Sequence, residues 1–399
     1  MSIICPTLLQ SFCNKCVRSL VISGIIASVW MVAGCTTTDS IQSDAANEAV
    51  DLAWPLPPEQ PRIKFIRAFF SEDQIVPPPA TMSRLRDSLL GTARESGRQL
   101  KKPYAVHADN KGRVFVADSG WGKVLVFDEP NKSFSVWGTE GKGILAKPLG
   151  ITSDSQGNIY VTDSVKQRVV VYTPDGKFLR AMGRKGELER PIGIAVDEKR
   201  NRVYVVDSVA HHIVVYNMTG ELLERIGKRG KETGEFNWPT NVALDSSGKI
   251  YIVDSMNFRV QILKSDGTFY KTFGSNGDSR GQFVRAKGIA VDSLGHIYVT
   301  DAAFNNFQIF DGEGALLLDV GSMGRKPGQF ILPAGVYIDQ KNKIYIADQY
   351  NFRIQIFQYL EDEKEVDKQE KMSNERSVKE NKVTSEKNTQ EHDRKGQEV

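Results

Sequence analysis

The chain has 399 residues, which is enough for two or three ordinary domains or for one large array of repeats. Hydrophobic residues make up 40% and charged residues 25%, so the composition excludes a collagen-like or a wholly disordered protein. The formal net charge of +3 is too balanced to indicate a nucleic-acid-binding protein. The 34 glycines predict many tight turns.

The first 34 residues have the features of a secretory signal peptide. Lys15 and Arg18 form a basic region, and residues 20–33 follow as an uncharged apolar run. This run is short for a membrane span but suits the apolar region of a signal. It ends in Val-Ala-Gly before Cys35, and this sequence resembles the lipobox of bacterial lipoproteins.

The resemblance implies that Cys35 becomes the N-terminus of the mature protein and carries a diacylglyceryl thioether and an N-acyl chain, a stable membrane anchor. Thr36 replaces the aspartate that retains many lipoproteins in the inner membrane, so the outer membrane is favoured where the host has one. The alternative is a plain signal peptide with an incidental cysteine. Since Cys5, Cys13 and Cys16 precede the cleavage point, we expect no disulfide and no Cys-x-x-Cys site in the mature chain.

Composition separates three further segments from the body of the chain. Residues 35–53 are small and polar and predict a flexible tether. Residues 54–100 form a lead-in, a closing strand and an insertion ahead of the repeats at 101–360. Residues 361–399 carry 12 acidic and 9 basic residues and no aromatic residue, so we expect a disordered charged tail.

The body of the chain repeats itself with a period of about 45 residues. Each repeat contains a β-branched and aromatic segment that ends in aspartate, such as Lys-Ile-Tyr-Ile-Val-Asp at 249–254. The repeat aspartates are Asp118, Asp163, Asp207, Asp254, Asp301 and Asp348. Several such segments per repeat, separated by glycine-containing turns, predict a four-stranded antiparallel meander. Meanders of this length pack face to face as the blades of a propeller.

The segments at 253–263 and 347–357 resemble the NHL repeat, with its Ile-Tyr-Val-x-Asp and Asn-x-Arg-Val-Gln pieces. The resemblance extends over the repeats and implies an all-β fold, a six-bladed β-propeller of four-stranded antiparallel blades. It implies little about function, because that family includes binding modules, lyase-like enzymes and proteins of unknown role.

The sixth repeat lacks an outermost strand, because the charged tail begins where this strand would stand. Residues 63–69 alternate apolar and basic residues and otherwise have no partner, so we expect them to pair with residues 353–358 and close the ring. Residues 54–61 would then be an extended lead-in along the rim. The alternative is a loose N-terminal arm.

The six repeat aspartates predict a ring of carboxylates, for which a cation site is one interpretation. The other interpretation is structural, because a base stands five residues after the aspartate in four repeats, at Lys123, Arg168, Arg259 and Arg353. We favour the structural role, in which an ion pair or a hydrogen bond braces the turn.

The sequence indicates no catalytic residue, metal ligand or cofactor. The amidating lyase, which has NHL-like repeats, binds zinc through histidines, but no two of the 5 histidines here occupy equivalent positions in different repeats. Gluconolactonase-like propellers use a buried glutamate with asparagines on central strands, where this chain offers Asn241 without a glutamate. His107 lies on a predicted innermost strand, where we expect it to pack against Tyr337 across the seam between the last and first repeats.

The connections between repeats share one face with the loops that follow the repeat aspartates. Counted over these connections and residues 72–102, this face has a net charge of +9. The residues that we expect to bind a partner combine arginines with aromatic side chains. They are Arg229, Arg280, Arg325, Trp121, Phe258, Phe304 and Phe352. The alternative is a solvated loop surface with incidental apolar plugs.

Together these features predict a lipid-anchored propeller of the bacterial cell envelope that acts as a binding scaffold. We expect an envelope protein or an anionic polymer as its partner, and export argues against nucleic acid. The alternative is an extracytoplasmic propeller enzyme, a hydrolase or lyase that acts at the axis with or without a metal ion.

Overall fold

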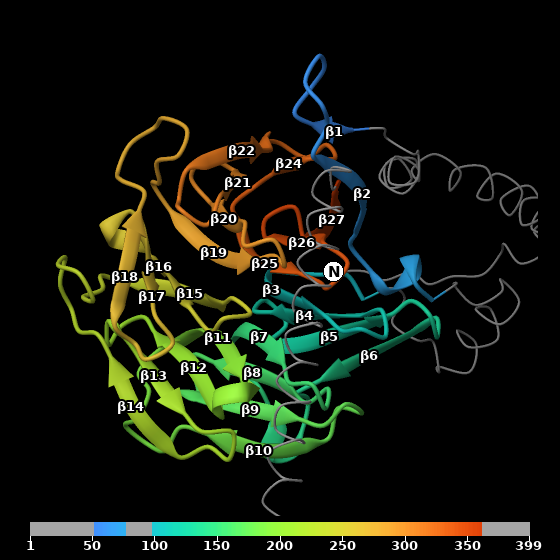
Figure 1. Cartoon of the computed structure of the whole chain (residues 1–399). Helices are drawn as coiled ribbons and strands as arrows, with labels where there is room; N and C mark the ends of the chain where they lie inside the picture. Colours follow the sequence, from blue (N-terminus) through green and yellow to red (C-terminus); the bar gives the residue numbers. More distant parts are fainter. Residues whose placement is uncertain (1–51, 77–97, 361–399) are drawn as a thin grey trace, which may run out of the picture. The chain divides into compact units, whose positions relative to one another are not determined.

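The β-branched and aromatic segments of the repeats form strands in the computed structural model, which describes residues 52–76 and 98–360. The strands assemble into antiparallel sheets, which are arranged as the blades of a six-bladed propeller (Figure 1). Five blades have four strands, and the sixth has four strands and a short fifth one. The predicted all-β fold class and blade architecture are therefore confirmed.

Blades one to three each consist of consecutive strands, which follow one another from the axis outward. Blade one contains β3 (Pro103–Ala108), β4 (Arg113–Asp118), β5 (Lys123–Asp128) and β6 (Ser133–Trp137). Blade two contains β7 (Pro148–Ser153), β8 (Ile159–Asp163), β9 (Arg168–Tyr172) and β10 (Phe178–Met182). Blade three contains β11 (Pro191–Asp197), β12 (Arg202–Asp207), β13 (His212–Tyr216) and β14 (Leu222–Ile226).

Blades four and five repeat this order. Blade four contains β15 (Pro239–Leu244), β16 (Ile250–Asp254), β17 (Arg259–Leu263) and β18 (Phe269–Phe273). Blade five contains β19 (Ala286–Val291), β20 (Ile297–Asp301), β21 (Asn306–Phe310) and β22 (Leu316–Val320). Short 3-10 helices are η1 (Glu72–Gln74), η2 (Gly141–Gly143), η3 (Glu198–Arg200) and η4 (Ser255–Asn257).

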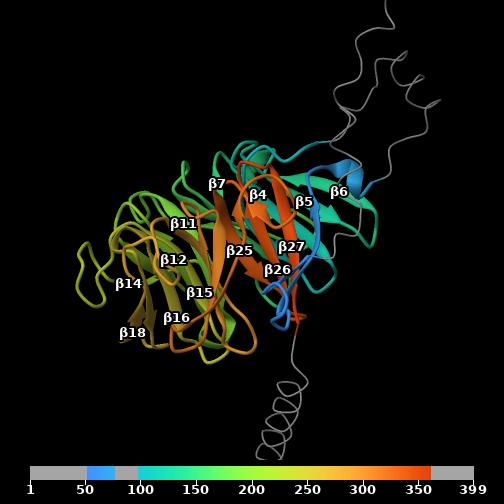
Figure 2. The ribbon, with the colours of Figure 1, turned by 90° about the horizontal axis from the view of Figure 1, so that it is seen from above.

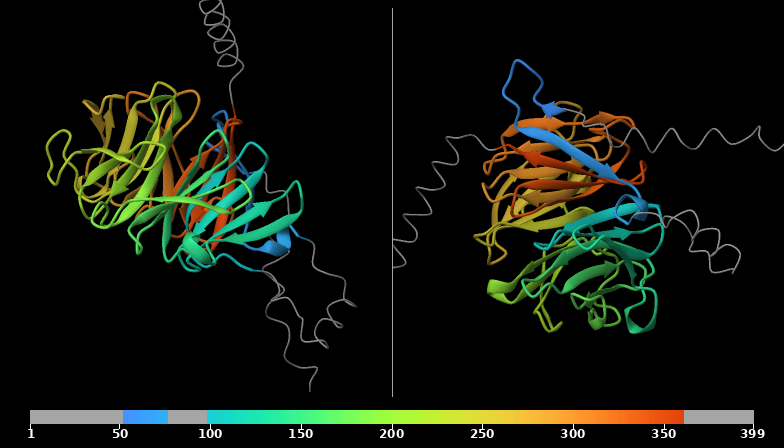
Figure 3. Two further views of the ribbon diagram at one scale, coloured as in Figure 1. Left: turned by 90° about the horizontal axis from the view of Figure 1, so that it is seen from below. Right: turned by 90° about the vertical axis from the view of Figure 1, so that its right-hand side faces the viewer.

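Blade six joins the two ends of the described chain. It contains β25 (Pro333–Ile338), β26 (Lys343–Asp348) and β27 (Arg353–Tyr359), followed outward by β2 (Ile63–Phe69) and β1 (Ala53–Trp54). β2 pairs antiparallel with β27, with Phe65 opposite Phe357, as predicted for the closing strand (Figure 3). The connection into this blade carries the small parallel pair β23 (Ser322–Met323) and β24 (Gln329–Phe330).

The expected extended lead-in at 54–61 is wrong. The chain folds back there as a hairpin, because Ala53 and Trp54 pair with Lys64 and Ile63 of β2. The Trp54 ring packs on Phe357 at 5.9 Å between centroids, so burial of an aromatic side chain holds the hairpin against the blade. Ala53, which belongs to the predicted tether at 35–53, is therefore a strand residue.

The innermost strands β3, β7, β11, β15, β19 and β25 surround the axis (Figures 1 and 2). They begin where the second strands end, since Pro103 pairs with Asp118 in blade one. We call the side of the propeller on which the innermost strands begin the loop face. It consists of the loops after the repeat aspartates and of the blade-to-blade connections at 138–147, 183–190, 227–238, 274–285 and 321–332. The turns after the innermost strands form the opposite side, the turn face.

Apolar side chains fill the spaces between neighbouring blades. Tyr160 of blade two and Val205 of blade three, for example, are both fully buried in one cluster. Three glycine-rich connections end in Phe236, Phe283 and Phe330, each 0% exposed, so these segments are connections with an aromatic plug.

Glycine permits the innermost strands to approach one another closely. A Cβ atom at Gly150 would lie 2.1 Å from the carbonyl oxygen of Ile192 in the next blade, and one at Gly288 would lie 2.4 Å from that of Ala334. Larger residues at these positions would push the strands apart and widen the axial channel.

The predicted signal peptide at 1–34, Cys35 and the charged tail at 361–399 lie outside the described residues. Among the residues that are described, no helix is long and apolar enough to cross a membrane.

Candidate functional site

The six repeat aspartates are fully buried at the ends of the second strands. Asp118 accepts backbone N–H bonds from Lys101 and Lys102, which precede the innermost strand, and from Gly120 and Trp121 in the following loop. Burial raises the pKa of Asp118, and these backbone hydrogen bonds oppose the increase. The carboxylate thus fastens the start of the innermost strand to the loop, and backbone donors occupy its oxygens.

The bases that follow the repeat aspartates behave in two ways. Arg259 and Arg353 form ion pairs with Asp254 and Asp348, with Nε–Oδ2 distances of 2.9 and 2.7 Å. In blade two the base forms hydrogen bonds in place of an ion pair, since Arg168 donates to the carbonyl oxygens of Lys142 and Ile144.

Lys123 in blade one likewise donates to a carbonyl oxygen, that of Gly138, at 2.7 Å. In both of these blades the aspartate accepts two backbone N–H bonds from the residues before the innermost strand, which take the place of the arginine. The base therefore braces the connection in all four repeats, and only two of them add an ion pair.

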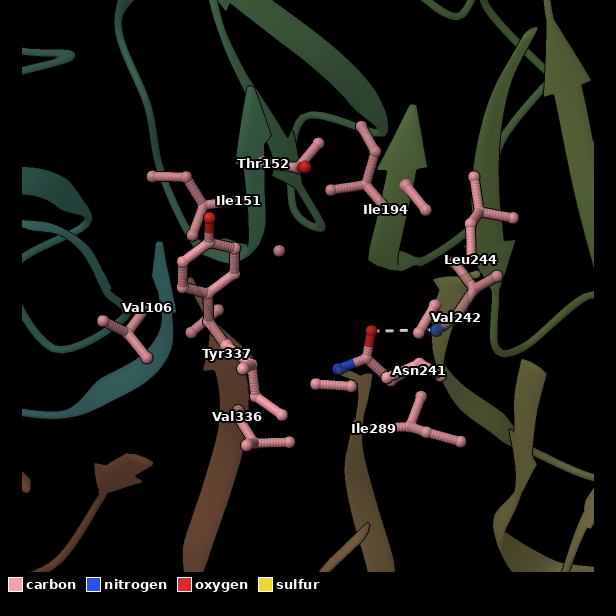
Figure 4. A pocket seen from close by; sticks show the side chains of 18 of the residues that line it. Val106, Ile151, Thr152, Ile194, Asn241, Val242, Leu244, Ile289, Val336 and Tyr337 are labelled. Carbon is pink, nitrogen blue, oxygen red and sulfur yellow. Dashed lines mark hydrogen bonds between the residues drawn. The ribbon is translucent and has the colours of Figure 1, made fainter. Parts of the chain in front are cut away.

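A cavity of about 240 Å³ occupies the axis of the ring. Its wall consists mainly of small and branched apolar side chains of the innermost strands, such as Ala195, Val242 and Ile289. Thr152, Asn241 and Tyr337 are the polar residues among those that line it (Figure 4). The Oδ1 atom of Asn241 accepts the backbone N–H of Val242 at 2.8 Å.

His107 and Tyr337 meet beside this cavity, as we expected from their strand positions. The Nε2 atom of His107 lies 2.8 Å from the Ser153 hydroxyl oxygen, and the imidazole is 4% exposed. Burial lowers the pKa of His107 to about 4, against a small opposing effect of Asp109. The imidazole is therefore neutral at physiological pH and packs as an aromatic ring.

Candidate metal ligands are dispersed over the described part of the chain. Within residues 52–76 and 98–360, no group of three or more His, Cys, Asp or Glu side chains is close enough to hold a metal ion together. The residues that line the axial cavity include no charged side chain.

The predicted binding residues lie on the loop face, where Arg229, Arg280 and Arg325 are all exposed. Arg280 forms an ion pair with Asp319 of β22, so its charge is partly compensated. Phe352 is 49% and Trp121 38% exposed, whereas Phe258 and Phe304 are half-buried. Lys101 places its Nζ atom 3.7 Å above the centre of the Trp121 ring, a cation–π contact at the surface.

The loop face also carries exposed apolar side chains that the sequence did not predict as binding residues. Exposed ones lie in the connections and in the loop of blade two. They are Ile144, Val165, Trp238, Val284 and Met323. Their place on this face followed from the repeat pattern, but their exposure did not, because the same connections also bury the plugs Phe236, Phe283 and Phe330.

Two family models match the repeats. A family described as a 6-bladed beta-propeller matches residues 145–228 and 189–262. The NHL repeat matches residues 283–310 and 330–357. The chain is a six-bladed β-propeller with NHL repeats. No curated protein matches the sequence.

Solved structures of several propellers are similar to this one. Virginiamycin B lyase from Staphylococcus aureus is 13% identical with a TM-score of 0.51, over 66% of this chain and 97% of that chain. A protein of unknown function from Bacteroides thetaiotaomicron is 19% identical with a TM-score of 0.51, over 65% and 70%. A gluconolactonase from Xanthomonas campestris is 15% identical with a TM-score of 0.50, over 65% and 87%. At these identities the similarity concerns the fold alone.

Proposed function

We propose that this NHL-repeat propeller is a lipid-anchored scaffold of the bacterial cell envelope and binds a protein partner through its loop face. The observation that carries the proposal is the combination of exposed aromatic and apolar side chains with arginines on that face. Aromatic residues, methionine and arginine are enriched at protein interfaces. An anionic envelope polymer is the second kind of partner that such a surface suits.

Membrane attachment in this proposal rests on the sequence around Cys35. Residues 36–52 separate this cysteine from the first strand, and a fully extended segment of that length spans about 60 Å. A tether of this reach allows the loop face to meet a partner that is itself held at the membrane. The outer membrane is the proposed site in a host that has one.

The loop-face proposal is tested with the charge reversals Arg229→Glu, Arg280→Glu and Arg325→Glu in one variant. A matched control reverses Lys111, Lys199 and Lys341, which are exposed on the turn face. We expect the loop-face variant to associate with its envelope partner more slowly, with a weaker dependence on salt, because exposed charges steer encounters. The partner is captured from detergent-solubilised envelopes with the wild-type lipoprotein and identified before the rates are compared.

Equal association rates and equal salt dependence in the two folded variants would contradict the scaffold proposal. The axial enzyme would then be the better candidate. It would have to act through Thr152, Asn241 and Tyr337, and burial raises the pKa of Tyr337, so that this phenol stays protonated at neutral pH.

A further inference from the structure

Cations surround the mouth of the axial channel on the loop face. In four of the six blades the residue immediately before the innermost strand is basic. These residues are Lys102, Lys147, Arg190 and Arg285. Their backbone N–H groups bond to the repeat aspartates, with distances of 3.0 Å for Lys147 and 2.8 Å for Arg190. The backbone from which each cation extends is therefore fixed by buried contacts.

Lys287 adds a fifth cation inside the mouth. It is the second residue of β19, and Thr240 of the neighbouring blade donates a hydrogen bond to its carbonyl oxygen at 2.9 Å. The Nζ atom of Lys287 lies 5.5 Å from the ring centre of Tyr104 on β3. Blade six stands between these two strands, and its residue at this level is the small Ala334. The lysine and the tyrosine thus meet across the mouth.

The charges at the mouth act on one another. Burial, together with the positive charges of Arg285 and Lys102, lowers the pKa of Lys287 to about 8. Burial raises the pKa of Tyr104, while Arg190 and Arg285 oppose that increase. Side chains from blades one, three and five therefore share a single electrostatic environment at the axis.

The five cationic side chains form no ion pair within the part of the chain that the structure describes. None of the ion pairs formed within 52–76 and 98–360 includes Lys102, Lys147, Arg190, Arg285 or Lys287. At the turn face the innermost strands end or are followed by aspartates, such as Asp154 and Asp292. At the loop face the repeat aspartates are fully buried and accept backbone N–H groups, so the charges that reach the mouth are positive and attract an anion.

We propose that the loop-face mouth of the channel binds an oxyanion with two negative charges, of which a phosphate group is the simplest example. Arg190 and Arg285 offer planar guanidinium groups for paired hydrogen bonds to oxyanion oxygens, and Lys287 supplies a point charge at the base of the site. The Tyr104 hydroxyl is a neutral donor beside them. The site lies on the loop face, but it is built from cations around the axis, and phosphate binding there does not depend on the scaffold function.

The decisive experiment measures binding of inorganic phosphate to the full chain in detergent by titration calorimetry at pH 7.5 and constant ionic strength. We expect saturable binding that Lys287→Met weakens by about tenfold or more, because one charged hydrogen-bond donor is lost. Lys287→Arg should retain binding. The control Lys111→Met, an exposed lysine of the turn face, should bind phosphate as the wild type does.

The pH dependence of sulfate binding provides a second test, which uses the folded wild type and does not rely on the Lys287→Met variant. Because the pKa of Lys287 is about 8, binding of sulfate, a dianion throughout this range, should fall as the pH rises from 7 to 9.5. In Lys287→Arg this decrease should vanish, since the guanidinium keeps its charge. The other charges that face Lys287 are Arg285 and Lys102, and both variants retain them.

Oligomers of glycerol phosphate, titrated in parallel, distinguish the source of the phosphate group. Tighter binding of the oligomer indicates a polymer as the ligand, and equal affinity indicates a free anion; either result supports the site. Absence of saturable binding of phosphate by the folded wild type, or equal affinity in wild type and Lys287→Met, would overturn it.

Discussion

His107 and Tyr337 pack edge to face across the seam between blades one and six, with ring centroids 4.4 Å apart. The same imidazole lies 2.8 Å from Ser153 of blade two through Nε2, so one buried ring contacts three blades. Its Nδ1 atom is buried without a hydrogen-bond partner. Protonation would place a charge in this apolar seam, which makes His107 sensitive to acid.

Acid should therefore weaken the propeller through His107. Its pKa in the folded state, about 4, lies below the value of an exposed histidine, so its contribution is present above pH 6.5 and is lost as the pH falls toward 4. Between pH 7 and pH 5 the loss amounts to about 2 kcal/mol. Comparing the free energy of unfolding of wild type and His107→Phe at both pH values isolates this contribution.

The phenylalanine keeps the aromatic packing but does not titrate, so the stability difference between the two proteins should change with pH. His211 and His212 remain in both proteins and contribute equally to each. A difference that stays constant from pH 7 to pH 5 would show that His107 does not titrate in the seam.

Closure of the ring should depend on the apolar face of β2. Phe65 is 6% exposed and packs on Phe357 at 5.6 Å between centroids, so Phe65→Ala should cost about 3–5 kcal/mol. The matched control is Ile66→Ala on the same strand, whose side chain is 45% exposed and whose loss should cost less than about 0.5 kcal/mol. Thermal melts of both variants measure the difference. Equal melting temperatures would mean that burial of the apolar face of β2 does not stabilise the closed ring.

The pair Asp348–Arg353 should be among the most costly contacts to break. Both side chains are almost completely buried, so Asp348→Asn leaves a buried guanidinium without its counter-charge. A loss of about 3–5 kcal/mol is expected, and Arg353→Met in the same chain should recover part of it. Asp175→Asn, which removes an exposed partner of Lys177, should leave denaturant unfolding unchanged. If the double variant loses the sum of the two single losses, the ion pair does not couple these residues.

The repeat pattern allowed the fold to be predicted, because each blade must bury both faces and therefore carries the same apolar period. The closing strand was predictable for a related reason, since 63–69 alternates like a strand and blade six lacked one. The hairpin at Trp54 was not predictable from the sequence, because pairing of β1 with β2 depends on the contact of Trp54 with Phe357, which lies far away in the sequence.

For the candidate sites, the sequence predicts where each residue lies in the repeat but not which partner its side chain contacts. The repeat placed Arg168 and Arg353 at equivalent points, and both donate to carbonyl oxygens of the connection, but Arg353 also donates to Asp348, because the backbone donors near the two aspartates differ. The contact of Lys287 with Tyr104 across the channel mouth has no signature in either repeat. Such contacts between distant blades emerge only when the ring is closed.

The predicted anchor is tested at Cys35, because acyl attachment requires its thiol. Cys35→Ser should incorporate no labelled palmitate and should move from the detergent phase to the aqueous phase, or remain as the uncleaved precursor. Each buried methylene contributes about 0.8 kcal/mol to membrane attachment, so loss of the acyl chains removes the anchor rather than weakening it. Cys16→Ser is the matched control, since this cysteine precedes the predicted cleavage point, and it should label as the wild type does. Persistent labelling of Cys35→Ser would place the lipid elsewhere or leave the chain with an ordinary signal peptide, and the scaffold would then reach its partner from solution.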